Sequence, residues 1–126
     1  MEVMDSTALA NFLIANPDLG EEALPPRLMG MEVLSTTLSE TAIILEETGA
    51  GRKAIANHLS NAIVYFDVED ATLYLMACVI YARTRFTYPE CVDYVYCLID
   101  ERTPHFENRE LQFAFDNRLY FGDYRR

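Results

Sequence analysis

The longest apolar stretch of the chain, DATLYLMACVIYARTR from Asp70 to Arg85, predicts a central helix. Between Ala71 and Ala82 only Thr72 is polar, apart from two tyrosine hydroxyls. A helix that is apolar all round leaves no face for water and is normally buried. We therefore expect a helix over about residues 69–86 that is covered on all sides and forms the middle of the fold.

Apolar residues three and four apart predict amphipathic helices before this segment. Asp5 or Ser6 is placed to cap a first helix that ends at Ala15. A second helix over residues 52–66 turns five apolar side chains inward, namely Ile55, Leu59, Ala62, Ile63 and Phe66.

The segment from Arg27 to Thr48 carries a third stripe, made of Leu28, Met31, Leu34 or Ser35, Leu38, Thr41 or Ala42, and Leu45. Gly30 and the serine and threonine cluster at 35–37 weaken it, so one helix or two shorter helices meeting near Thr37 both fit the pattern. The stripe faces either the core or a second copy of the chain. Because it is short and lacks charged flanking partners, we favour the core.

After the central segment, Thr87 and Glu90 form the pattern of a capping box, with Pro89 in the first turn. This predicts a helix from Tyr88 to about Glu101 whose inward residues are Val92, Val95, Leu98 and Ile99.

The C-terminal region fits two structures. Thr103, Pro104 and Glu107 look like a helix start, and Leu111, Phe115 and Leu119 are four apart. Residues 111, 113 and 115 also alternate, which fits a β-hairpin over 110–121. We favour the helix, because an isolated hairpin is marginally stable. The whole chain, residues 1–126, is thus predicted to be a single acidic all-α domain, a compact bundle of five to six helices.

Charge is the most unusual property of the composition. The chain has a formal net charge of −10, and its first 51 residues hold nine acidic residues against Arg27 alone, a net of −8. Such a surface repels phosphate backbones and anionic lipids, so we expect no direct binding of nucleic acid or membrane. It attracts a protein with a basic surface, although solubility alone also accounts for it.

The cysteines give no sign of a disulfide framework or a metal site. Cys78, Cys91 and Cys97 are odd in number and form no CxxC pair, which is typical of reduced thiols. No signal peptide opens the chain, and its apolar run is too short to span a bilayer. We expect a cytoplasmic protein, in the host-cell cytosol if it is viral.

No catalytic constellation is apparent. The sequence has no Walker loop, GxGxxG, HExxH or EF-hand pattern, so we predict no cofactor and no metal. His58 is the one candidate general base, but no nucleophile or orienting partner stands at a recognisable spacing. IANHL, within the segment AIANHLSNAIVYFDVEDATLYLMA, lacks the glycine and the basic face of a helix-turn-helix. The whole segment resembles, in a few apolar and tyrosine positions, helices of small phage-encoded antirestriction proteins that imitate DNA.

These observations favour a non-enzymatic protein-binding function. The tyrosines at 74, 81 and 88 recur every seven residues near Arg83 and Arg85, and tyrosine and arginine are common in interfaces. Amphipathic packing at the edge of the core, with the hydroxyls reaching water, fits the same tyrosines and is the more common arrangement. The predicted contact residues are Glu21, Glu22, Glu32, Glu40, Glu46, Glu47, Tyr74, Tyr81, Arg83, Arg85 and Tyr88. A sharper hypothesis is a phage-type inhibitor whose carboxylates imitate phosphates. The alternatives are a small structural subunit or homodimeric adaptor, and third an enzyme that uses His58.

Overall fold

Six α-helices and one isolated bridge make up the regular secondary structure of the residues that the structure describes. The computed structural model describes residues 3–16, 31–66 and 68–120. The helices are α1 (Ser6–Ala15), α2 (Ser35–Glu47), α3 (Arg52–Tyr65), α4 (Ala71–Arg83), α5 (Tyr88–Ile99) and α6 (Arg109–Asp116). The predicted all-α bundle is therefore confirmed.

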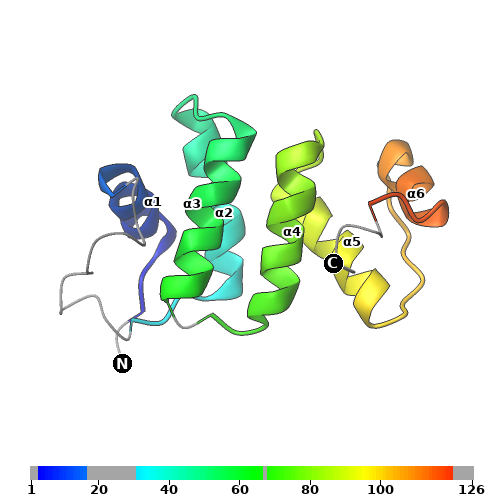
Figure 1. Cartoon of the computed structure of the whole chain (residues 1–126), viewed down its shortest axis with the longest axis horizontal. Coiled ribbons are helices and arrows are strands. Elements are labelled where there is room, and N and C mark those ends of the chain that lie inside the picture. The colour runs from blue at the N-terminus through cyan, green and yellow to red at the C-terminus, as the bar shows by residue number, and fades with distance from the viewer. Residues whose placement is uncertain (1–2, 17–30, 67, 121–126) are drawn as a thin grey trace.

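The helices form two short layers with one helix at each end (Figure 1). In this view α3 and α4 lie side by side, α2 lies behind α3, α5 lies behind α4, and α1 and α6 close the two ends. All six helices contribute to one hydrophobic core; examples, from α1 to α6, are Leu9, Leu38, Leu59, Ile80, Val95 and Leu111. Helix α4 packs most extensively against α3 and α5, so its central position is confirmed.

The prediction that α4 is covered on all sides is wrong. Val79 is 43% exposed, and Leu75 and Met76 are only half-buried. Thr72, Met76, Val79 and Arg83 fall on one side at three-four spacing, and this side faces away from the residues that pack in the core. An apolar run thus supplies a core helix that still has a solvent side.

Helix α2 begins later than predicted. The described residues 31–34 are not helical, because Val3 and Glu32 form a parallel bridge and the Met4 amide donates to the Glu32 carbonyl at 3.0 Å. Val33 is fully buried there, whereas Leu34 is exposed. From Ser35 onward the predicted stripe holds, since Leu38, Thr41, Ala42 and Leu45 are buried. Arg27, Leu28 and Gly30 lie outside the described residues.

Two of the predicted helix starts are confirmed in detail. Asp5 caps α1 by accepting a hydrogen bond from the Ala8 amide at 2.8 Å. At α5, Thr87 accepts from the Glu90 amide at 3.2 Å, and the Glu90 carboxylate accepts from the Thr87 amide at 2.9 Å. The predicted inward face of α5 is partly wrong: its buried residues are Tyr88, Cys91, Tyr94 and Val95, while Ile99 is exposed.

The C-terminal element is a helix from Arg109 to Asp116, so the hairpin over 110–121 is not the structure of its described part. The helix starts later than Thr103, because the cap is Asn108, whose side chain accepts from the Glu110 and Leu111 amides. The Asn108 side-chain amide in turn donates to the Glu90 carboxylate at 3.1 Å. The starts of α5 and α6 are therefore linked through Glu90.

Within the described ranges, no helix combines the length and the apolar character needed to cross a bilayer.

Candidate functional site

The predicted acidic contact residues are partly confirmed as surface groups. Glu40, Glu46 and Glu47 are exposed on α2, whereas Glu32 is half-buried beside Val3. Glu21 and Glu22 lie outside the described residues. Helix α2 is thus the described element that presents several of the predicted carboxylates together.

The outer side of α2 also carries an exposed apolar residue. Ile43 is 50% exposed, and Glu40 and Glu47 flank it at three- and four-residue spacing. The opposite side of the helix holds the buried Leu38 and Leu45. We call Glu40, Ile43 and Glu47 the α2 acidic face. This face presents negative charge that is complementary to a basic protein, together with apolar area that a contact would bury.

The predicted tyrosine surface is wrong. Tyr81 is 0% exposed and Tyr88 is buried as well, while Tyr74 is half-buried. The three residues do lie near one another, since the Tyr88 hydroxyl donates to the Tyr74 carbonyl at 3.0 Å and the rings of Tyr81 and Tyr88 meet edge to face at 5.8 Å. The seven-residue spacing of these tyrosines therefore reflects contacts in the core and not an exposed helix face.

Tyr81 lies in a polar cluster with Arg52 and Glu46. The Tyr81 hydroxyl donates to the Glu46 carboxylate, and the Arg52 guanidinium carbon lies 3.9 Å from the centre of the Tyr81 ring. Arg52 also donates through Nε to the Tyr81 carbonyl at 2.9 Å and through Nη2 to the Phe86 carbonyl. The cluster joins α2, α3 and α4, with every group partnered inside the chain. We call it the Tyr81 cluster and assign it a structural role.

The two arginines of the predicted surface lie at the C-terminal end of α4. Arg83 and Arg85 are both exposed, and Arg83 occupies the last turn, where a cation suits the negative end of the helix dipole. Because Tyr81 and Tyr88 are buried, the predicted tyrosine and arginine surface is reduced to these two arginines and the half-buried Tyr74.

Burial shifts the pKa values of several ionisable groups in and around the core. Burial raises the pKa of Cys78, and it raises the pKa of Cys91 to about 12, so both thiols stay protonated and are poor nucleophiles. Burial lowers the pKa of His58, which is half-buried on α3. Among the described residues, no three histidine, cysteine or acidic side chains lie close enough together to hold a metal ion.

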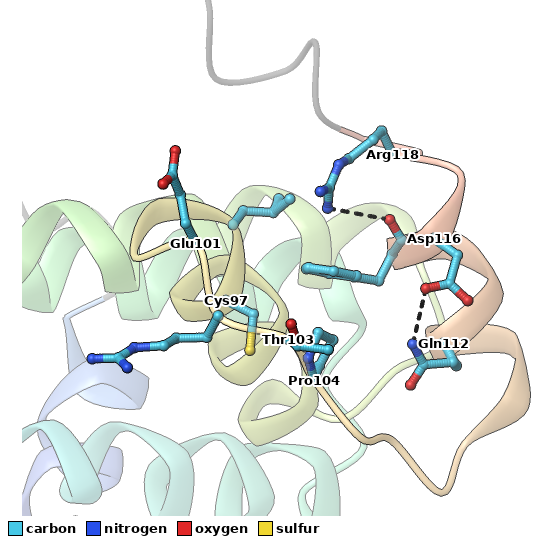
Figure 2. Close-up of a pocket in the computed structure, with 10 residues that line it drawn as sticks. Cys97, Glu101, Thr103, Pro104, Gln112, Asp116 and Arg118 are labelled. Atoms are coloured by element: carbon cyan, nitrogen blue, oxygen red, sulfur yellow. Dashed lines mark hydrogen bonds between the residues drawn. The ribbon is translucent and has the colours of Figure 1, made fainter.

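A cavity of about 450 Å³ lies between the end of α5, the connection after it and α6 (Figure 2). Cys97 and Glu101 come from the α5 side, Thr103 and Pro104 from the connection, and Gln112 from α6. The Gln112 side chain is already engaged, since it donates to Asp116 at 3.0 Å and accepts from the Phe106 amide at 2.9 Å. These hydrogen bonds join the segment after α5 to α6, so the polar lining of the cavity has a structural role.

The charges around this cavity are of both signs and do not favour one class of ligand. Its lining mixes Arg102 and Arg118 with Glu101 and Asp116. Burial, followed by the charge of Asp93, raises the pKa of Cys97, which leaves the thiol protonated. We therefore assign no catalytic role to this cavity.

A smaller groove of about 110 Å³ lies between the first turn of α4 and the last turn of α5. Its lining residues are Asp70, Leu73, Tyr96, Ile99 and Asp100. Tyr96 is 42% exposed and Ile99 is 48% exposed, so the groove is bounded by apolar surface that remains in contact with water. We call it the α4–α5 groove.

Sequence reasoning missed the α4–α5 groove, because it assigned Ile99 to the core and gave Asp70 and Asp100 no contact role. One signal was present: Asp93, Tyr96 and Asp100 stand three and four apart, which places a tyrosine between carboxylates on one side of α5. The approach of α4 to that side could not be read from the spacing.

No family model, curated protein or solved structure matches the chain.

Proposed function

We propose that the chain is a non-enzymatic protein-binding domain that engages a basic surface of another protein. The observation that carries the proposal is the α2 acidic face, where Glu40 and Glu47 flank the half-exposed Ile43. Exposed carboxylates accelerate encounter with a cationic partner, and an apolar residue between them supplies area that is desolvated on contact. The net charge of −10 supports a cationic partner.

The finer hypothesis is inhibition by mimicry of nucleic acid. Its motive is the net charge of −8 in the first 51 residues together with a single lysine in the whole chain. In this hypothesis the carboxylates stand in for phosphates and occupy the basic groove of a nucleic-acid-handling protein. Competition tests it directly: duplex DNA and this chain should exclude each other from the partner, and a stable ternary complex would contradict mimicry while leaving protein binding intact.

The homodimeric adaptor has less support. Of the described residues of the predicted stripe, Leu38, Thr41, Ala42 and Leu45 are buried within the chain and are not available to a second copy, whereas Met31 is half-buried and Leu34 is exposed. Sedimentation of the purified protein at micromolar concentration tests this alternative, for which a dimer would be required.

The proposal is tested with a purified basic partner, obtained by capture from cells of the source organism and identified by mass spectrometry. The variant Glu40→Gln/Glu47→Gln removes two charges from the α2 acidic face. We expect roughly tenfold weaker binding at low salt, from two charge pairs worth up to about 1 kcal/mol each. The affinity of the unaltered chain should also fall as salt is raised.

The matched control is Glu107→Gln/Glu110→Gln, which removes the same charge from exposed positions around the start of α6. Measured at the same salt concentration, this variant should weaken binding much less than the α2 variant does, because the influence of an exposed charge falls with its distance from the contact. Equal weakening by the two variants would indicate a net-charge effect and contradict a defined contact surface. Affinity that does not change with salt would contradict the proposal itself.

A further inference from the structure

We propose that the α4–α5 groove is the subsite that receives an arginine side chain of the partner protein. This inference rests on the proposed function and names the chemistry of one contact within it. The groove brings together Asp70 and Leu73 from the start of α4 with Tyr96, Ile99 and Asp100 from the end of α5. These residue types match the two parts of an arginine, an apolar stem and a cationic, planar head.

Within the part of the chain that the structure describes, the carboxylates of the groove have no cationic partner. The five lining residues include no lysine, arginine or histidine, and within the described part of the chain neither Asp70 nor Asp100 accepts a side-chain hydrogen bond. Asp70 occupies the N-cap position of α4 with φ of 58°, yet its side chain makes no capping bond. Its carboxylate is therefore available to a donor from outside the chain.

Local electrostatics favour a cation at this position. Asp100 is the C-cap of α5, where the helix dipole is negative and a carboxylate is unfavourable. A guanidinium bound beside Asp100 would offset the unfavourable interaction of this carboxylate with the negative end of the α5 dipole.

The chain contains an internal example of the proposed contact. In the Tyr81 cluster, the Arg52 guanidinium lies over a tyrosine ring while the same tyrosine bonds to the Glu46 carboxylate. The α4–α5 groove has a tyrosine and two carboxylates at the opposite end of the same helix pair, and the cation is the component that its lining does not include. An arginine fits better than a lysine, because its planar head both stacks on an aromatic ring and bonds carboxylates in pairs.

The first test uses a defined probe, a helical alanine and leucine peptide with one central arginine, titrated into the full chain labelled with ¹⁵N. Two matched peptides replace the arginine by lysine or glutamine. We expect saturable shifts of the amides of Asp70, Leu73, Tyr96 and Ile99, about threefold weaker affinity for the lysine peptide, and no saturation with the glutamine peptide. Equal binding of all three peptides, or shifts that cluster on α2, would overturn the inference.

The second test compares variants with the same probe and with the purified partner. Tyr96→Ala/Asp100→Asn should weaken the arginine peptide about tenfold, and Glu40→Gln/Glu47→Gln should leave it unchanged within twofold. Asp100→Asn alone should weaken binding of the arginine peptide about threefold. Because Asp100 is exposed, this single variant keeps the test decisive if the double variant is destabilised. If neither groove variant weakens peptide binding, the inference is wrong.

The partner measurement separates this inference from the proposed function. Weakening by the α2 variant alone would leave the proposed function standing and overturn the groove as the arginine subsite. Weakening by the groove variant supports the inference, whether or not the α2 acidic face also contributes. Failure of both variants, together with salt-independent affinity, would overturn the proposed function and the inference together.

Discussion

The two ends of the α4 and α5 pair use similar residues in opposite ways. At one end, Tyr81 is fully buried and joined to Arg52 and Glu46. At the other end, Tyr96 is exposed in a groove with Asp70 and Asp100. The difference lies in the cation, which α3 supplies at the first end and which is not among the residues that line the second.

This contrast separates a structural polar cluster from a contact surface. Arg52 commits Nε and Nη2 to two backbone carbonyls and one face of its guanidinium to the Tyr81 ring, so we assign the Tyr81 cluster to stability. Carboxylates beside exposed apolar groups have little effect on stability and are free to serve binding. The predictions below test this contrast, from the largest expected effect to the smallest.

Alkaline pH should destabilise the folded state through the buried tyrosine and cysteine side chains of the core. Burial raises the pKa of Tyr81 and Tyr88 above the ordinary tyrosine value, and it raises the pKa of Tyr94 and of Cys91 to about 12. The folded state therefore holds these protons more tightly than the unfolded state does. Stability should be complete below about pH 9 and fall as pH rises toward 12.

The measurement is denaturant unfolding at stepped pH, with helicity followed by circular dichroism and phenol ionisation by tyrosinate absorbance. The buried phenols should ionise together with the loss of helix. In the variant Tyr94→Phe the alkaline decline should be shallower, because one raised group is removed. Ionisation of all eight tyrosines before any loss of helix would contradict the burial of Tyr81, Tyr88 and Tyr94.

Arg52→Ala should have the next largest effect. It removes the bonds to the Tyr81 and Phe86 carbonyls and the contact with the Tyr81 ring, and we expect a loss of about 3 kcal/mol in the free energy of unfolding. Urea titration followed by circular dichroism measures it. Lys53→Ala, the exposed neighbouring cation, is the control and should change stability by no more than about 0.5 kcal/mol.

Removal of a single hydroxyl from each end gives the sharpest comparison. Tyr81→Phe removes the donor to Glu46 and should cost about 1 kcal/mol, because a partly buried hydrogen bond is lost while the ring stays. Tyr96→Phe should change stability by less than about 0.5 kcal/mol, since the site is exposed. Equal costs for the two substitutions would show that the ends do not differ in the way proposed here.

The features of the fold that could be predicted from the sequence are those whose interacting residues lie within a few positions of one another. The Thr87 and Glu90 capping box and the Asp5 cap are each three residues across. The inward face of α3 also follows from its own spacing, and all five of its predicted residues are buried. Local hydrogen bonds and helical periodicity suffice for such features.

Contacts between distant residues account for what could not be predicted. The partners that bury Tyr81, namely Glu46 and Arg52, lie 35 and 29 residues away in sequence. A tyrosine suits both an interface and a core edge, so its spacing alone cannot distinguish the two. The late start of α2 likewise depends on Val3, which bridges to Glu32 from the other side of α1.

The hydrogen bond between Asn108 and Glu90 means that the stability of α6 depends on the start of α5. With eight residues, α6 is too short to persist alone, and the group that orients its cap belongs to a side chain that also starts α5. Replacement of Glu90 in the course of charge reduction would therefore loosen two helices at once, so that the connecting loop near Pro104 would become accessible to proteases.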